Sequence, residues 1–126
     1  WHASAQVKLT TSRLGLGHLP LATSDDSDDR ARIIQTAAAR ALNVEVDQAA
    51  RTLREDAQSL GGVVYVGDGV WDARTARSLG IGFVGVRLRG GPARLHAEGA
   101  RWVCEGFADG PGTLDLLERA IQGSWR

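Results

Sequence analysis

Two aspartates at a glycine-rich turn are the residues of this sequence best suited to do chemistry. Asp68 follows the apolar run Val63–Val66 and one glycine, and Asp72 comes four positions later. The run is short, β-branched and aromatic, which is typical of a strand buried on both faces of a parallel sheet. Open α/β sheets bind ligands in the crevice beyond the carboxyl ends of such strands. Two carboxylates that converge there would suit a hard cation, which prefers oxygen ligands.

Asp72 also has a structural interpretation, because it falls in the first turn of an expected helix. An aspartate there interacts favourably with the helix dipole and accepts hydrogen bonds from free backbone N–H groups. Asp68 lies between Gly67 and Gly69, where a carboxylate has little structural work to do, so we expect it to be functional. Trp71 could line the mouth of such a site, although packing between helix and sheet is the more usual arrangement for its ring.

The other reactive side chains lack a recognisable pattern. His2, His18 and His96 share no metal-binding spacing, and Cys104 lies in an expected strand without neighbouring histidines. The segment Gly80–Gly85 spells G-x-G-x-x-G, but a dinucleotide-binding motif must follow a strand and open a helix. Here the glycines lead into a strand and lie within it. The sequence therefore argues against a dinucleotide cofactor.

The composition narrows the class of protein further. The 126 residues are enough for one domain, and 43% of them are hydrophobic, enough for a core. Lys plus Arg and Asp plus Glu number 15 each, which favours no nucleic-acid partner. With one cysteine and no run of about 18 apolar residues, we expect no internal disulfide, no membrane partner and a cytoplasmic location. Since the chain begins at Trp1 and contains no methionine, we expect it to be processed or part of a longer protein.

Apolar periodicity and turn residues predict the elements that would position these side chains. The expected helices are residues 1–14, 28–42, 47–60, 71–79, 93–98 and 111–121, and the expected strands are 19–23, 63–66, 81–86 and 101–104. Ser24 or Ser27 is expected to cap the second helix. Its inward residues would be Ile33, Ile34, Ala37, Ala38 and Ala41, and the third helix has the clearest apolar stripe, Val46, Ala49, Ala50, Leu53, Ala57 and Leu60.

Strands separated by helices favour parallel pairing through crossover connections. The expected fold class is therefore α/β with a doubly wound parallel sheet. We find no repeat and no linker in the sequence, so residues 1–126 are expected to form a single domain.

At this point the sequence resembles a known family. The segment Val63–Asp72, followed by Ala76–Ile81, resembles the fourth motif of the haloacid dehalogenase-like (HAD) hydrolases, a strand followed by G-D-x-x-x-D and a helix. The segment Phe83–Val86 and the closing helix are also similar to that family. The resemblance covers about the second half of the chain, and it implies a Rossmann-like HAD core of which this chain is the C-terminal part.

The first half of the chain is less similar to the family. The segment Leu21–Asp26 followed by Arg30 resembles the region of the third motif, where a basic residue, usually lysine, begins a helix. The resemblance makes Arg30 the candidate catalytic cation, whereas a solvated arginine that pairs with Asp26 or Asp29 is the structural alternative. Lys8 is a rival cation, which we interpret as a surface residue.

The first two motifs of the family are missing from the sequence. No expected strand ends in D-x-D, the motif that carries the nucleophilic and the acid–base aspartates. The resemblance implies a Mg²⁺-dependent phosphatase acting on a phosphorylated small molecule through an aspartyl-phosphate. Asp68 would hold the ion, directly or through water, and Asp72 would also belong to the metal site, where it would support the ligands of the ion. The nucleophile would lie outside these residues.

A second hypothesis belongs to a different class of function. The chain would be a non-catalytic remnant or one half of a split protein, acting through association with a second copy or a complementing chain. In the family the sheet order is 5-4-1-2-3, with residues 63–66 as strand 4 and residues 19–23 as strand 3. Strands 1 and 2 would precede Trp1, so strand 4 would have an unpaired edge that favours association.

Overall fold

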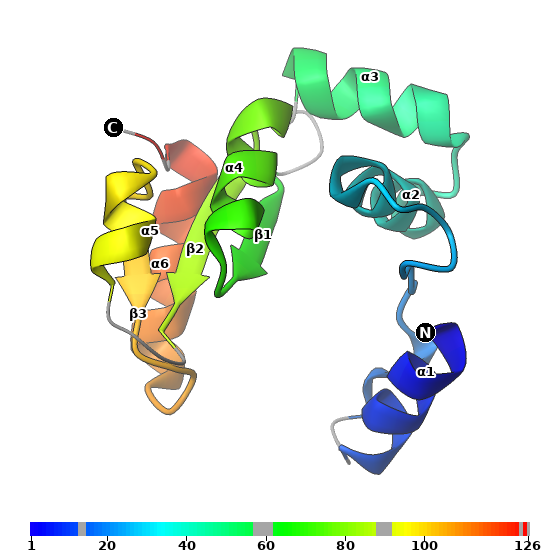
Figure 1. Ribbon diagram of the computed structural model, residues 1–126, viewed down its shortest axis with the longest axis horizontal. Helices are drawn as coiled ribbons and strands as arrows, with labels where there is room; N and C mark the ends of the chain where they lie inside the picture. The colour runs from blue at the N-terminus through cyan, green and yellow to red at the C-terminus, as the bar shows by residue number, and fades with distance from the viewer. Residues whose placement is uncertain (13–14, 57–61, 88–91, 124, 126) are drawn as a thin grey trace. The chain divides into compact units, whose positions relative to one another are not determined.

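The computed structural model describes residues 1–12, 15–56, 62–87, 92–123 and 125 (Figure 1). They gather into two compact units, Trp1–Arg51 and Thr52–Arg126. The single domain expected from the sequence stays a prediction. In the described residues, no helix combines the length and the apolar character that a membrane crossing requires.

The elements described in the N-terminal unit are all helical. They are α1 (His2–Thr11), the 3₁₀ helix η1 (Leu16–His18), α2 (Arg30–Leu42) and α3 (Val46–Asp56), which continues into the second unit. Helix α1 lies within the expected range 1–14, but it has no buried residue, and its Val7 is 61% exposed. The prediction of residues 13 and 14 as helical lies outside the described residues.

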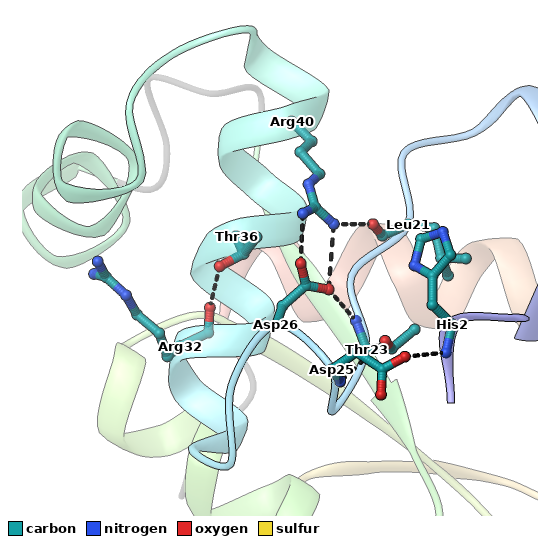
Figure 2. A network of polar contacts seen from close by, with 8 residues as sticks. All are labelled: His2, Leu21, Thr23, Asp25, Asp26, Arg32, Thr36 and Arg40. Carbon is teal, nitrogen blue, oxygen red and sulfur yellow. Dashed lines mark hydrogen bonds and ion pairs between the residues drawn. The ribbon is translucent and has the colours of Figure 1, made fainter.

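The expected strand at residues 19–23 is wrong, because this segment forms no strand. Figure 2 shows the reason: the guanidinium of Arg40 donates to the Leu21 carbonyl and to the carboxylate of Asp26. The same carboxylate accepts from the Thr23 backbone N–H at 2.8 Å. Side chains thus satisfy backbone groups that a strand would offer to a neighbouring strand. The Arg40 guanidinium also lowers the pKa of the Asp26 carboxyl.

Helix α2 begins two residues later than expected and with a different cap. Its cap is Asp29, whose side chain accepts from the Ala31 N–H at 2.9 Å, and neither Ser24 nor Ser27 has this role. Four of the expected inward residues are only half-buried and Ala41 is exposed, while Gln35, Thr36 and Ala39 are buried. The prediction of this face was wrong because alanines, with one methyl group each, distinguish the faces of a helix weakly.

Helix α3 confirms three of the four described residues of its predicted apolar stripe. Ala49, Ala50 and Leu53 are buried, and Leu53 is 1% exposed, whereas Val46 in the first turn is only half-buried. The later stripe residues Ala57 and Leu60 lie outside the described residues.

The C-terminal unit contains a parallel sheet. Its strands are β1 (Val64–Gly67), β2 (Gly82–Val86) and β3 (Trp102–Cys104), paired in the order β1-β2-β3. Tyr65 lies opposite Phe83, and Val84 lies opposite Trp102. The α/β class and the parallel pairing are therefore confirmed, with three strands in the described residues where four were expected.

Helices cover both faces of this sheet (Figure 1). They are α4 (Val70–Leu79), α5 (Ala93–Ala97) and α6 (Gly110–Gln122). A Cβ added at Gly82 would lie 2.6 Å from the Ala120 carbonyl of α6, whereas one added at Gly85 would lie 2.6 Å from the Leu95 side chain of α5. Residues 82 and 85 point to opposite faces of β2, because side chains alternate along a strand. Helices α5 and α6 thus pack on opposite faces.

The core of this unit is centred on β2. Ile81, Phe83 and Val84 are at most 1% exposed, and Ala73 and Ala76 of α4 are fully buried. Strand β1 differs from the prediction: none of its residues is buried, and Val66 is 36% exposed. The reason is its position, since among the described residues β1 lies at the edge of the sheet and pairs with β2 alone.

Candidate functional site

A cleft of about 230 Å³ lies at the carboxyl ends of β1 and β2, where the sequence predicted a ligand site. Its walls come from the β1–α4 turn, the end of β2 and helix α5. The lining residues are Asp68, Gly69, Val70, Trp71, Val86, Arg87, Arg94 and Leu95. Parallel strands bring these residues together because their carboxyl ends meet at one edge of the sheet.

Asp68 presents a carboxylate to this cleft. It is the residue after β1, its side chain is exposed, and it makes no hydrogen bond or ion pair with another residue in the described ranges. An exposed carboxylate without a protein partner keeps its oxygens available for a ligand. The role of Asp68 as a metal ligand stays a prediction.

Asp72 has a different environment. It is 6% exposed, and its two carboxylate oxygens accept from the Tyr65 hydroxyl at 2.9 Å and from the Gly69 N–H at 3.0 Å. It therefore holds the Gly69 turn against β1 and is not part of the cleft lining. The structural interpretation of Asp72 accounts for both contacts, so any role in metal binding would act through the turn that carries Asp68.

Gly67 makes room for this buried carboxylate. A Cβ at position 67 would lie 2.5 Å from the Cβ and 2.6 Å from Oδ2 of Asp72, closer than side chains tolerate. The pattern G-D-x-x-x-D thus has a packing explanation at its first and last positions, Gly67 and Asp72. Asp68 is the position of the pattern left for a ligand.

Trp71 lies in the lining of the cleft and is 64% exposed. Packing between helix and sheet, the arrangement expected as more usual, is therefore wrong for this ring. The guanidinium carbon of Arg74 lies 5.2 Å from the ring centroid, a cation–π contact. Arg74 itself is held by Glu98, with Nε donating to Oε2 at 2.9 Å and a second nitrogen donating to Oε1 at 2.6 Å.

Two arginines of the cleft were missed by the sequence reasoning. Arg87 follows β2 and forms an ion pair of 3.0 Å with Glu105, and Arg94 lies in α5. A signal for Arg87 was present, because it directly follows the expected strand 81–86, at the same sheet edge as Asp68. Arg94 had no comparable signal, since its position depends on how α5 packs against β2.

Arg30, the cation favoured by the resemblance, and its rival Lys8 both belong to the N-terminal unit. Arg30 is the first residue of α2 and is exposed, and Lys8 lies in the last turn of α1 and is also exposed. An exposed Lys8 agrees with its interpretation as a surface residue. The catalytic role of Arg30 stays a prediction.

The donor set of the cleft fits Mg²⁺ only in part. Among the described residues there is no group of three or more His, Cys, Asp and Glu side chains that could hold a metal ion. Asp68 offers one free carboxylate, and Mg²⁺ commonly keeps several waters while it is bound through one or two carboxylates and substrate phosphates. One carboxylate beside two guanidinium groups is therefore compatible with an ion that arrives together with an anionic substrate.

A second hollow of about 390 Å³ lies beside the start of α6, lined by Cys104, Glu105 and Asp109 among others. The Asp109 carboxylate accepts from the Gly112 N–H at 3.0 Å and caps α6. Because that aspartate is engaged in capping and Glu105 pairs with Arg87, we assign the candidate site to the cleft of Asp68.

Comparison of the chain with protein-family models, with curated proteins and with solved structures found no match. The resemblance of the G-D-x-x-x-D segment to the HAD hydrolases therefore stays an expectation from the sequence.

Proposed function

We propose that this chain carries the magnesium- and phosphate-handling part of a HAD-like hydrolase that acts as a phosphatase on a phosphorylated small molecule. The observation that carries the proposal is the carboxylate of Asp68, which has no protein partner among the described residues and lies on a glycine turn at the carboxyl end of β1. The arginines on the other wall of the same cleft support a substrate that is an anion. The α/β sheet would be part of a doubly wound, Rossmann-like HAD core.

In the proposed reaction each residue of this chain has a limited role. Mg²⁺, when bound, would offset the repulsion between an attacking carboxylate and the phosphoryl oxygens. Asp68 would provide an oxygen ligand for it, and Asp72 would fix the turn that aims Asp68 through its bond to the Gly69 N–H. The attacking aspartate is proposed to come from outside these residues, and Arg30 is proposed to stabilise the developing negative charge.

Substitution of Asp68 tests the metal site directly. We expect Asp68→Asn to weaken Mg²⁺ binding by at least about tenfold, because a neutral amide replaces the charged ligand. Titration calorimetry of the purified chain measures this affinity. The matched control is Glu118→Gln, which removes one charge from an exposed carboxylate of the same unit and should leave the affinity unchanged. Equal Mg²⁺ affinity of the wild type and Asp68→Asn would remove Asp68 from the proposed site.

A second function, association without catalysis, is favoured by the exposed edge of β1. Within the described ranges this strand pairs on one side only, and its Val66 is 36% exposed. Such an edge can pair with a strand from a second copy or from a complementing chain. Association by itself would also be compatible with the proposed hydrolase, because a complementing chain could supply the nucleophile.

A further inference from the structure

We propose that Arg94, assisted by Arg87, forms an oxyanion-binding subsite in the part of the cleft that comes from the end of β2 and from α5. Its ligand would be a small phosphate, and it would bind without a metal ion. The anion site rests on the residues of the cleft alone, whereas the identification of the anion as a phosphate rests on the proposed function.

Arg94 has no protein partner among the residues that the structure describes. Its side chain is exposed, and no hydrogen bond or ion pair joins it to another residue in the described part of the chain. Other arginines of the same unit are paired, Arg74 with Glu98 and Arg119 with Asp115. Arg94 therefore keeps its fork of N–H donors available, a geometry that matches two oxygens of a phosphate or carboxylate.

The charge of the cleft favours an anionic ligand. Its lining contains two guanidinium groups and one carboxylate, so its formal charge is positive although the whole chain is neutral. Arg87 is only partly engaged, because its partner Glu105 is 80% exposed at the side chain and such pairs hold weakly. An anion that entered the cleft could therefore bind both guanidinium groups.

The volume of the cleft favours a small ligand. Pockets for drug-sized ligands occupy roughly 300–1,000 Å³, and this cleft occupies about 230 Å³. It fits inorganic phosphate or the phosphate end of a small ester more readily than a large cofactor. The exposed ring of Trp71 forms an apolar part of the wall, against which a short carbon chain could pack.

Phosphate binding in the absence of metal tests this subsite. Inorganic phosphate is titrated into the full chain with a chelator present and at constant ionic strength, and the indole N–H signal of Trp71 is followed by NMR. The signal is identified with Trp71→Phe. We expect the wild type to bind, and Arg94→Ala to lose at least about tenfold in affinity, since a charged hydrogen-bonding partner is removed.

Two further variants test which property of Arg94 binds phosphate and whether binding is specific to the cleft. Arg94→Lys keeps the charge but not the fork, so its affinity should lie between those of the wild type and Arg94→Ala. Arg54→Ala removes an exposed arginine of the same unit outside the cleft and should bind as the wild type does. Absence of phosphate binding to the wild type, or equal affinity of Arg94→Ala, would overturn the subsite.

The Asp68→Asn variant distinguishes failure of the subsite from failure of the proposed function. Without metal, removal of the carboxylate from the cleft should tighten phosphate binding, because a like charge beside the anion is gone. If Asp68→Asn leaves Mg²⁺ binding intact while Arg94→Ala loses phosphate, the proposed metal site is wrong and the anion subsite stands. In the reverse pattern, Asp68→Asn loses Mg²⁺ binding while Arg94→Ala binds phosphate as the wild type does. That result would contradict the subsite and leave the proposed metal site standing.

Discussion

At the scale of single residues, the buried Asp72 and the open Asp68 show how two carboxylates of one motif divide their work. The carboxylate oxygens of Asp72 accept hydrogen bonds from the Tyr65 hydroxyl and the Gly69 N–H. These bonds fix the turn in which Asp68 lies. A buried carboxylate is stable only with such partners, because burial without hydrogen bonds is costly. The carboxylate of Asp68 has no partner among the described residues, so it is the one of the two that can bind a ligand.

Gly67 provides a residue-scale test of this arrangement. Gly67→Ala should destabilise the C-terminal unit by about 1–3 kcal/mol, because the new methyl group would overlap the Asp72 side chain and force it to shift. Urea unfolding measures the change. Gly17→Ala, where an added Cβ has open space around it, is the control and should change stability by less than about 0.5 kcal/mol. An unchanged midpoint for Gly67→Ala would mean that Asp72 moves without cost and does not fix the turn.

At the scale of elements, helices α4 and α5 are joined by the ion pair of Arg74 with Glu98, the residue that follows α5. Both oxygens of Glu98 accept from the guanidinium, a two-point contact that fixes orientation as well as distance. Since α4 carries Trp71 and α5 carries Arg94, this pair connects the two helices that contribute side chains to the cleft.

The ion pair makes the stability of this unit depend on pH. The Arg74 guanidinium lowers the pKa of Glu98 below its ordinary value of 4.5. A lowered pKa contributes stability that is complete above the ordinary value and is lost as the pH falls through the folded-state value. Glu98→Gln should therefore be less stable than the wild type at pH 7, and the difference should shrink below pH 4.5. Thermal unfolding from pH 7 to pH 3 measures both, and a difference that does not change with pH would contradict the role of this charge.

At the scale of the whole molecule, the exposed edge of β1 predicts association. We expect the purified chain to form dimers or larger species at high concentration, since an apolar strand edge without a partner pairs with other chains. Light scattering measures the mass. Val66→Lys should lower it, because a charged side chain disfavours pairing at an edge, whereas Val7→Lys changes an exposed valine of α1 and should not. A compact monomer with metal-dependent hydrolysis of a phosphate ester would contradict both the association and the proposal that the nucleophile comes from elsewhere.

Features that depend on neighbours close in sequence could be predicted before the structure was known. The existence of strand β1, the end of α4 at Gly80 and the buried Ala49, Ala50 and Leu53 were all predicted, because local propensity and periodicity control them. Gly80 has a positive φ of 68°, which glycine adopts without strain. The placement of Asp68 at the end of a parallel strand follows from the same local pattern.

Features that depend on partners distant in sequence could not be predicted and became visible in the folded chain. The segment of Leu21 is not a strand because its carbonyl accepts a hydrogen bond from the Arg40 guanidinium. Trp71 is exposed because it lines a cleft instead of packing between helix and sheet. Arg94 meets Asp68 in one cleft because α5 packs on β2, and β1 is half-exposed because of its place in the sheet. Periodicity along a chain describes which face of an element is apolar, but the contacts that use a given side chain form only when distant segments pack together.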